Sequence, residues 1–274
     1  MPTADKNPVV SVAMGVRYKR SDTTLLERSV RSILAQSFTN FEFLICQQDS
    51  TPEAVAMLEQ LATEDDRINL IYGAEADSLT KKLNRCISAA QGDYLARMDD
   101  DDYALPERLT SQVSFLEQHP GIAFVGCAVK VEQSGKIVGQ RRFPERPAVH
   151  DFFMTQPYIH PALVFRKAAL DTVGGYRLED DCAGCEDYEL LLRLYEAGFT
   201  GANLTTPQLI YTIPPKGTTN RSFAMRYNEV RTRYRRFRAL GLLPSTLPYV
   251  IKPMAAGLIP TALLERWKAR RMSR

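Results

Sequence analysis

The stretch Tyr94-Leu-Ala-Arg-Met-Asp-Asp-Asp-Asp102 joins a short apolar run to four successive aspartates. The run from Tyr94 to Met98 has the length of a buried strand, and Arg97 is its only charged residue. Adjacent carboxylates repel one another unless a cation or water compensates their charge, so such a run is often a solvated acidic turn. The carboxyl end of a buried strand, however, is where open α/β sheets bind ligands. The stretch therefore predicts an α/β fold with an anionic ligand site at the edge of its sheet.

Apolar runs alternate with helical patterns on both sides of this stretch. Alternation at this spacing is typical of parallel strands joined by helical crossovers, with helices on both faces of the sheet. The predicted strands before it are Val9–Met14, Phe41–Cys46 and Ile68–Tyr72, and the predicted helices are Leu25–Leu34, Pro52–Leu61 and Leu79–Ala90. After it we expect a helix over 106–118, a hairpin over 122–138, a strand over 162–165 and a helix over 187–197.

The aspartate run has the chemistry of a divalent-metal site. Mg²⁺ and Mn²⁺ prefer carboxylate oxygens together with substrate phosphates. Such an ion would bridge the two phosphates of a nucleoside diphosphate and neutralise the charge on the leaving group. We expect Asp99 and Asp101 to contact the sugar or ribose and the metal, and Asp102 to cap the following segment.

A second acidic site lies at Glu186-Asp187, where the last predicted helix begins. Acidic residues favour the first turn of a helix because of its dipole and free N–H groups, so capping is one interpretation. The other is a general base that removes the proton of an acceptor hydroxyl during sugar transfer with inversion. Two separate acidic sites supply the division of labour that this reaction requires.

With both sites identified, the chain resembles the family 2 glycosyltransferases, and within them the bacterial subgroup encoded with capsule and exopolysaccharide clusters. The resemblance extends from Val9 to about Ile213. The segments that carry it include Ser32-Ile-Leu-Ala-Gln36-Ser-Phe38, Leu83-Asn84-Arg85, Gly92-Asp93 with the strand and aspartates that follow, Pro106-Glu-Arg108, Ile159-His160-Pro161, Gly174-Gly175-Tyr176 and Glu186-Asp187-Tyr188.

The resemblance implies a GT-A fold, a mixed sheet flanked by helices, and an inverting enzyme that uses a nucleotide-diphosphate sugar and Mn²⁺ or Mg²⁺. Asp99 and Asp101 match the family's DxD motif, with Asp101 as the metal ligand, and Asp187 in the Glu186-Asp187 pair matches the catalytic base. His160 falls in a loop expected near the acceptor. The nucleotide-sugar residues implied by the resemblance are Asp99, Arg97, Asp93, Gln47, Gln48, Asn84 and Lys82.

Two features depart from the family pattern. Relatives carry an Asp-Asp stretch after the second strand, whose aspartate recognises the nucleotide base, and here Gln47-Gln48 stands there. A glutamine amide can hydrogen-bond a uracil or thymine edge but carries no charge. Many relatives also have a histidine after the last core strand, whereas Tyr211-Thr-Ile-Pro-Pro-Lys216 has none. Gln47-Gln48 also motivates an alternative function, a glycosyltransferase-like interaction protein with weak or lost catalysis.

The charge of the 274-residue chain is divided between an acidic body and a basic tail. From Lys216 onward there are 14 Lys/Arg and 2 Asp/Glu, although the whole chain carries a net charge of only +3. We therefore predict a catalytic domain over 1–215 and a basic helical extension over 216–274. Tyrosines lie between arginines from Arg226 to Arg238, and Trp267 precedes Lys268, Arg270 and Arg271 in a pattern typical of an interfacial anchor.

The tail leaves two interpretations open, docking on a membrane surface and packing on the catalytic domain or on a second copy. Docking would bring the enzyme to a lipid-linked saccharide acceptor, as a peripheral protein on the inner face of the cell membrane. No nucleic-acid-binding module and no secretory signal are visible, which favours the cytoplasm and no nucleic-acid partner. The five cysteines are scattered and fit reduced thiols, and Cys182-Ala-Gly-Cys185 is interpreted as a plain loop.

Overall fold

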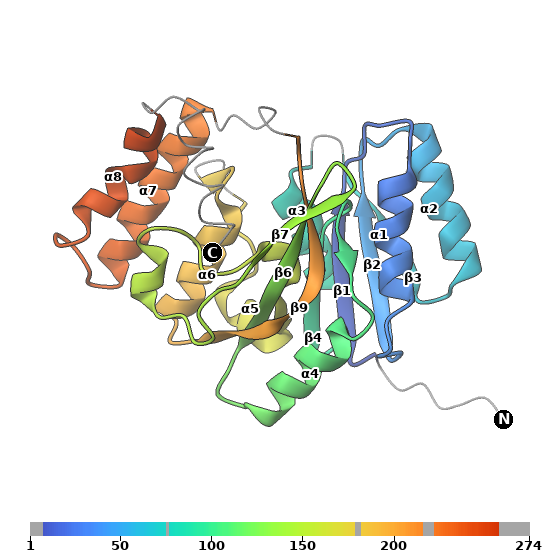
Figure 1. Cartoon of the computed structure of the whole chain (residues 1–274), viewed down its shortest axis with the longest axis horizontal. Helices are drawn as coiled ribbons and strands as arrows, with labels where there is room; N and C mark the ends of the chain where they lie inside the picture. The colour runs from blue at the N-terminus through green and yellow to red at the C-terminus, as the bar shows by residue number, and fades with distance from the viewer. Residues whose placement is uncertain (1–7, 75–76, 179–181, 216–221, 258–274) are drawn as a thin grey trace.

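One mixed sheet forms the centre of the molecule in the computed structural model, which describes residues 8–74, 77–178, 182–215 and 222–257 (Figure 1). The strand order is β3-β2-β1-β4-β8-β6-β9-β5, and β7 pairs with β6. The strands are β1 Val10–Val16, β2 Phe41–Gln47, β3 Ile68–Tyr72, β4 Tyr94–Met98, β5 Tyr103–Ala104, β6 Phe124–Gln133, β7 Lys136–Arg141, β8 Val164–Arg166 and β9 Gly201–Ile213.

Helices cover both faces of this sheet, as the alternating sequence pattern predicts. They are α1 Thr24–Leu34, α2 Pro52–Glu64, α3 Leu79–Ala89, α4 Arg108–Gln118, α5 Lys167–Val173, α6 Glu186–Glu196, α7 Phe223–Ala239 and α8 Leu247–Gly257, with 3-10 turns η1 Val149–Phe152 and η2 His160–Ala162. Successive strand residues point to opposite faces, so Val12 packs in the cluster with α1, α2 and α4, whereas its neighbour Ala13 packs in the cluster with α3, α5 and α6.

The register of β4 decides where its aspartates lie. Met98 pairs with Met14 of the parallel strand β1, and Val16 at the end of β1 pairs with Gln47 at the end of β2. The carboxyl ends of these three strands therefore meet at one sheet edge. On its other side β4 pairs with β8, which is antiparallel, so the sheet is mixed as the resemblance implies.

The basic extension continues the helical layer on the α6 side of the sheet. Helix α7 packs against α6 and against α8, and Phe237 and Val250 lie in the same buried cluster as Leu190 and Leu191 of α6. Packing on the body is thus observed for residues 222–257, and the domain division at 215 remains a proposal. The predicted anchor at Trp267, Lys268, Arg270 and Arg271 lies outside the described residues, as does Lys216.

Candidate active site

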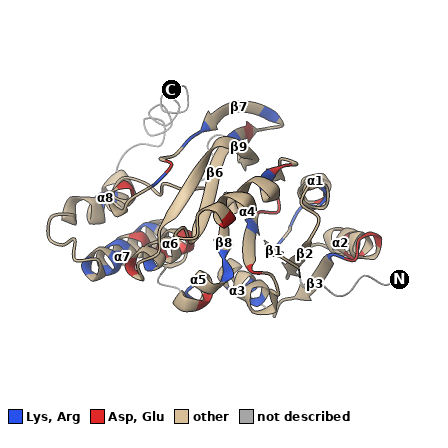
Figure 2. Cartoon of the chain, turned by 90° about the horizontal axis from the view of Figure 1, so that it is seen from below, with Lys and Arg blue, Asp and Glu red and all other residues tan. Residues whose placement is uncertain are grey.

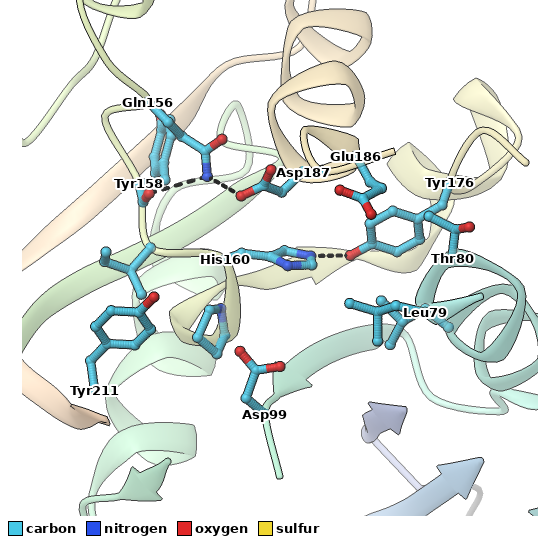
Figure 3. A pocket seen from close by; sticks show the side chains of 14 residues that line it. Leu79, Thr80, Asp99, Gln156, Tyr158, His160, Tyr176, Glu186, Asp187 and Tyr211 are labelled. Carbon is cyan, nitrogen blue, oxygen red and sulfur yellow. Dashed lines mark hydrogen bonds between the residues drawn. The ribbon is translucent and has the colours of Figure 1, made fainter. Parts of the chain in front are cut away.

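The two acidic sites face one cavity of about 300 Å³. Asp99 enters it from the end of β4, Glu186 and Asp187 from the first turn of α6, and His160 from η2 (Figure 3). In that view Asp99 lies on one side, the acidic pair lies on the other, and the His160 ring lies between them. The two sites are 87 positions apart in sequence at their first residues, so the tertiary fold alone brings them together.

Two buried arginines support the turn that carries Asp99. Arg97 is only 1% exposed, and it donates hydrogen bonds to Asp99 Oδ1 at 2.5 Å and to the Met98 carbonyl oxygen. Arg108, fully buried on α4, donates to the Arg97 carbonyl oxygen at 2.7 Å, and burial lowers its pKa to about 10. These guanidinium groups partly compensate the charge of the neighbouring carboxylates. This is the structural reason for a charged residue, Arg97, inside the buried strand β4.

The aspartate run forms a compact cluster of oxygen ligands. One carboxylate oxygen from each of Asp99, Asp101 and Asp102 lies within 4.8 Å of the others. Burial, followed by the charge of Asp99, raises the pKa of Asp101 to about 6 and that of Asp100 to about 7. The raised pKa values indicate that the neighbouring arginines do not fully compensate these carboxylates, a condition that a bound divalent cation satisfies.

Asp102 has a different local role from the predicted cap. Its Oδ1 accepts a hydrogen bond from the Thr212 backbone N–H of β9 at 2.8 Å, whereas Oδ2 is buried and has no hydrogen-bond partner among the described residues. The prediction that Asp102 caps the next segment is wrong, because the curled sheet brings β9 over the turn. A buried, unpartnered carboxylate oxygen beside Asp99 and Asp101 supports the fit of a metal ion to this cluster.

Asp187 is directed into the cavity by a side chain from outside its helix. Gln156 donates from Nε2 to Asp187 Oδ2 at 2.9 Å and to the Tyr158 carbonyl oxygen at 3.2 Å. Asp187 Oδ1 accepts from the adjacent Tyr188 N–H, and the N-cap position itself is Cys185. Capping therefore accounts for part of the carboxylate's environment, and the cavity accounts for the rest.

His160 belongs to a chain of hydrogen bonds along one wall. Its Nε2 lies 2.5 Å from the Tyr176 hydroxyl, and burial together with Arg97 lowers the pKa of His160 well below its usual value. Asn84 holds Tyr176 in place by donating to its carbonyl oxygen at 2.7 Å and accepting from its N–H at 2.8 Å. Asn84 thus fixes the wall through Tyr176 instead of facing the cavity itself.

The glycines before Tyr176 explain why Asn84 can approach so closely. Gly175 has φ +65°, and a β-carbon there would lie 2.7 Å from Asn84 Oδ1. Gly174 also has a positive φ, +73°, but has open space around it. The Gly-Gly-Tyr segment is therefore a turn that only glycine at 175 fits without moving Asn84.

Helix α7 reaches the site through Arg233. This side chain is 2% exposed, lies 4.6 Å from the centroid of the Tyr188 ring, and donates to the Phe153 carbonyl oxygen at 2.9 Å. Tyr188 in turn donates its hydroxyl to the Phe152 carbonyl oxygen at 2.7 Å. The contacts join the residue after Asp187 to the segment that leads to Gln156.

Among the seven predicted nucleotide-sugar residues, Asp99 alone is in the lining of this cavity. Arg97 and Asn84 act on it through Asp99 and Tyr176, and the other four lie elsewhere. Gln47 and Gln48 are buried at the end of β2, where Gln47 Oε1 has no hydrogen-bond partner. Lys82 on α3 is 2% exposed, and burial lowers its pKa. These three lie toward the same sheet edge as Asp99. Asp93 does not, since it precedes β4 whereas Asp99 follows it, so the length of the strand separates them. Asp93 is exposed at the opposite edge, and its prediction as a nucleotide-site residue is wrong.

Gln156, Tyr158 and Arg233 contribute to the site without any sequence signal. Gln156 lies in an irregular segment and Arg233 in a helix full of arginines, so neither residue stands out in its context. Tyr176 had a signal, the Gly-Gly-Tyr segment, although the role of its hydroxyl beside His160 depends on the tertiary structure.

Comparisons with known proteins identify the family and the fold of the chain. The model of glycosyl transferase family 2 matches residues 17–175, and the chain belongs to that family. It is 34% identical over 271 residues to the putative glycosyltransferase EpsE of Bacillus subtilis, covering 98% of this chain and 96% of EpsE. It is 28% identical over 223 residues to the O-antigen biosynthesis glycosyltransferase WbnJ of Escherichia coli, covering 79% and 84%.

Two solved structures show the same fold. Residues 1–349 of S. aureus TarS in complex with UDP-GlcNAc give a TM-score of 0.67 at 18% identity, covering 89% of this chain and 72% of that one. The mannosyltransferase PcManGT from Pyrobaculum calidifontis, in complex with GDP-Man and Mn²⁺, gives 0.59 at 17% identity, covering 98% and 81%. The fold is GT-A-like, and the chain is a glycosyltransferase of a family that includes enzymes of surface polysaccharide biosynthesis.

Proposed function

We propose that this glycosyltransferase transfers one sugar from a UDP- or dTDP-type donor to a hydroxyl of a lipid-linked glycan, with inversion of configuration at the anomeric carbon. The observation that carries the proposal is the position of Asp99 and Asp187 in one cavity, on separate elements, with a neutral histidine between them. With the leaving diphosphate near Asp99 and the acceptor hydroxyl near Asp187, the two groups would lie on opposite sides of the sugar. Inversion requires this arrangement.

Asp99 and Asp101 are the residues proposed to hold Mn²⁺ or Mg²⁺. Their carboxylates concentrate negative charge, and Asp102 Oδ2 beside them has no hydrogen-bond partner among the described residues. Both features fit a hard cation with oxygen ligands. A divalent ion held by these carboxylates would act as a Lewis acid and stabilise the negative charge of the leaving diphosphate. Arg97 holds Asp99 Oδ1, which leaves Oδ2 of that residue for the ligand. The Mn²⁺ in the similarly folded PcManGT complex supports a metal, without deciding which one is used here.

Asp187 is the proposed general base, with Glu186 beside it. As the acceptor oxygen bonds to the anomeric carbon, the bond from that carbon to the diphosphate oxygen breaks, and the hydroxyl proton moves to the Asp187 carboxylate. Gln156 fixes Oδ2, so the carboxylate keeps one orientation toward the cavity. His160 lines the proposed acceptor side and, being uncharged, can exchange hydrogen bonds there without repelling a cation.

The nucleotide is proposed to lie over the ends of β1 and β2. Gln47 and Gln48 offer amides to a base edge, and Lys82 offers a buried cation toward the phosphates. The buried, unpartnered Gln47 Oε1 supports this role, since a base N–H would satisfy it. The UDP-GlcNAc bound by TarS supports a uridine-type donor.

The acceptor is proposed to be lipid-linked, with the enzyme peripheral on the inner face of the cell membrane. No helix within 8–74, 77–178, 182–215 or 222–257 is long and apolar enough to span a bilayer. The basic extension and the O-antigen role that WbnJ's name gives support a surface-associated enzyme that meets a membrane-bound glycan.

The experiment has two arms. A panel of nucleotide sugars, each with and without Mn²⁺, is screened for thermal stabilisation, since a ligand that binds the native state raises the melting temperature. The stabilising donor is then used in transfer, and NMR of the product gives the anomeric configuration. We expect metal-dependent stabilisation by a UDP- or dTDP-sugar and an inverted product. A retained configuration would refute the assignment of Asp187 as a base.

The alternative from Gln47-Gln48, an interaction protein with weak or lost catalysis, predicts a different result in calorimetry with UDP and Mn²⁺. A non-catalytic chain that has lost nucleotide binding gives no metal-dependent heat of binding. The enzyme gives heat that disappears when Mn²⁺ is replaced by chelator.

A further inference from the structure

Helix α7 carries arginines on a buried inner face and on an exposed outer face. The inner face is buried, and its arginines meet carboxylates: Arg233 pairs with Glu229 at 2.9 Å, and Arg236 pairs with Glu196 at 2.6 Å. Arg236 also lies 3.9 Å from Glu189 of α6. These inner charges hold α7 on the body and are compensated within the protein.

The outer face of α7 forms a groove with α8 of about 780 Å³. Figure 2 shows the Lys and Arg colour along α7, next to α8. We call the six residues Tyr227, Arg231, Tyr234, Arg238, Leu247 and Ile251 the α7–α8 face. All six are exposed, and Tyr227 and Ile251 expose 51% and 59% of their surface. Among the residues that the structure describes, no acidic side chain lines the groove, and Glu229, the one carboxylate of residues 222–257, belongs to the inner face.

The composition of this face indicates its partner. Tyrosines, arginines and aliphatic side chains together are typical of helices that lie at the surface of an anionic bilayer, where the rings and stems enter the headgroup region and the cations meet phosphates. A two-fold contact with a second copy would bring like-charged arginines of the same face together, which is unfavourable. The excess of 14 Lys/Arg over 2 Asp/Glu from Lys216 onward adds to the attraction for an anionic surface.

We infer that the α7–α8 face docks this enzyme on an anionic lipid bilayer. Helix α7 packs on α6, whose first turn carries Glu186 and Asp187, so docking would place the cavity one helix layer from the lipid surface. The inference rests on the proposed function in one respect: docking would give the enzyme access to a lipid-linked acceptor. The docking itself is measured without catalysis.

The test is sedimentation of the full chain with vesicles, at low and high salt. Vesicles of phosphatidylcholine alone are compared with vesicles of equal parts phosphatidylcholine and phosphatidylglycerol. The variants are Arg231→Gln with Arg238→Gln, and Leu247→Ser with Ile251→Ser. The control is Lys130→Gln with Lys136→Gln, which removes two exposed charges from β6 and β7. Melting temperature and donor hydrolysis are measured for each, and both should match the wild type.

The wild type should bind the anionic vesicles, less at high salt, and ignore the neutral ones. At about 1 kcal/mol for each basic residue near the surface, the double arginine variant should bind roughly 30-fold more weakly. The apolar variant should also bind more weakly, and the control should bind as the wild type does.

Several outcomes overturn the inference. Unchanged binding by both variants would place docking elsewhere on the chain, and equal binding to neutral vesicles would remove the charge argument. A wild-type dimer that the variants dissociate in ultracentrifugation would make the face an interface between copies. An RNA complex lost in the arginine variant, without vesicle binding, would identify a nucleic-acid surface. Intact vesicle binding with no transfer to any glycan would instead count against the proposed function alone.

Discussion

Arg233, near the middle of the C-terminal helix α7, lies 4.6 Å from the centroid of the Tyr188 ring, one residue after the proposed base Asp187. The same guanidinium holds the Phe153 carbonyl oxygen, and Tyr188 holds that of Phe152. Arg233, which lies outside the matched range 17–175, thus helps to hold the segment next to the proposed base. We therefore expect sugar transfer to depend on α7, which, like Asp187 itself, lies beyond the residues that the family model matches.

Replacing Arg233 by methionine should destabilise the protein by about 3–5 kcal/mol, because it removes one partner of the buried ion pair with Glu229. Urea denaturation measures the change. The double variant Arg233→Met with Glu229→Met should recover most of the stability but little of kcat, because the hydrogen bond to Phe153 stays lost. Full recovery of kcat in the double variant would show that Arg233 matters for stability only.

Replacing Gln156 by leucine should lower kcat by roughly 10- to 100-fold, since a hydrogen bond to a charged group contributes about 1.5–3 kcal/mol. The donor KM should change little, because Gln156 contacts the proposed base and not the aspartate cluster. Steady-state kinetics with saturating metal provide the comparison. A large rise in donor KM with kcat unchanged would place Gln156 in the donor site instead.

The two glycines before Tyr176 form a matched pair. Gly175→Ala should cost more stability than Gly174→Ala, because both require a positive φ but only residue 175 meets Asn84 Oδ1, at 2.7 Å. Backbone strain alone is worth about 1–3 kcal/mol, and the contact adds to it. Gly175→Ala should also reduce activity by displacing Tyr176 from His160. Equal melting temperatures for the two variants would contradict this interpretation of the turn.

The raised pKa of Asp100 makes the stability of the metal-free protein depend on pH. Because burial raises this pKa from 3.8 to about 7, the folded state binds more protons than the unfolded state between these values. Stability should therefore fall as pH rises from about 4 to about 7 in the presence of chelator. Asp100→Asn should be more stable than the wild type at pH 8 and similar to it at pH 4. The denaturant midpoints of the wild type and Asp100→Asn are compared at the two pH values. The same difference in midpoint at pH 4 and pH 8 would be inconsistent with the raised pKa.

Most of the sheet follows from the sequence, because its parallel half is built from short, mostly apolar runs that alternate with helical patterns. The predicted strands at Phe41–Cys46 and Tyr94–Met98 agree with β2 and β4 within one residue. Strand β9 is harder to find, since Pro207 and two threonines interrupt its apolar pattern and its pairing with β6 shifts register there. The seven residues of α5 are too few for a clear helical period.

The candidate site could be predicted where a motif coincides with the end of a strand or the start of a helix. Asp99 follows β4 and Glu186-Asp187 begins α6, so simple position places each one. Asp93 shows the limit, because it is next to the same strand in sequence yet lies at the wrong edge of the sheet. Gln156 and Arg233 depend on tertiary contacts between segments 31 and 45 positions apart from Asp187 and Tyr188, which no local pattern encodes.

The most direct test of the two-site division is calorimetric titration of donor and Mn²⁺ into Asp101→Ala and Asp187→Asn, together with single-turnover transfer by each variant. Asp187→Asn should bind donor and Mn²⁺ like the wild type, while its transfer rate falls by about 10²–10⁴-fold, the range for loss of a general base. Asp101→Ala should lose the metal-dependent part of donor binding. Wild-type transfer by Asp187→Asn, or unchanged metal-dependent binding by Asp101→Ala, would contradict the assignment of base and metal ligand to these two aspartates.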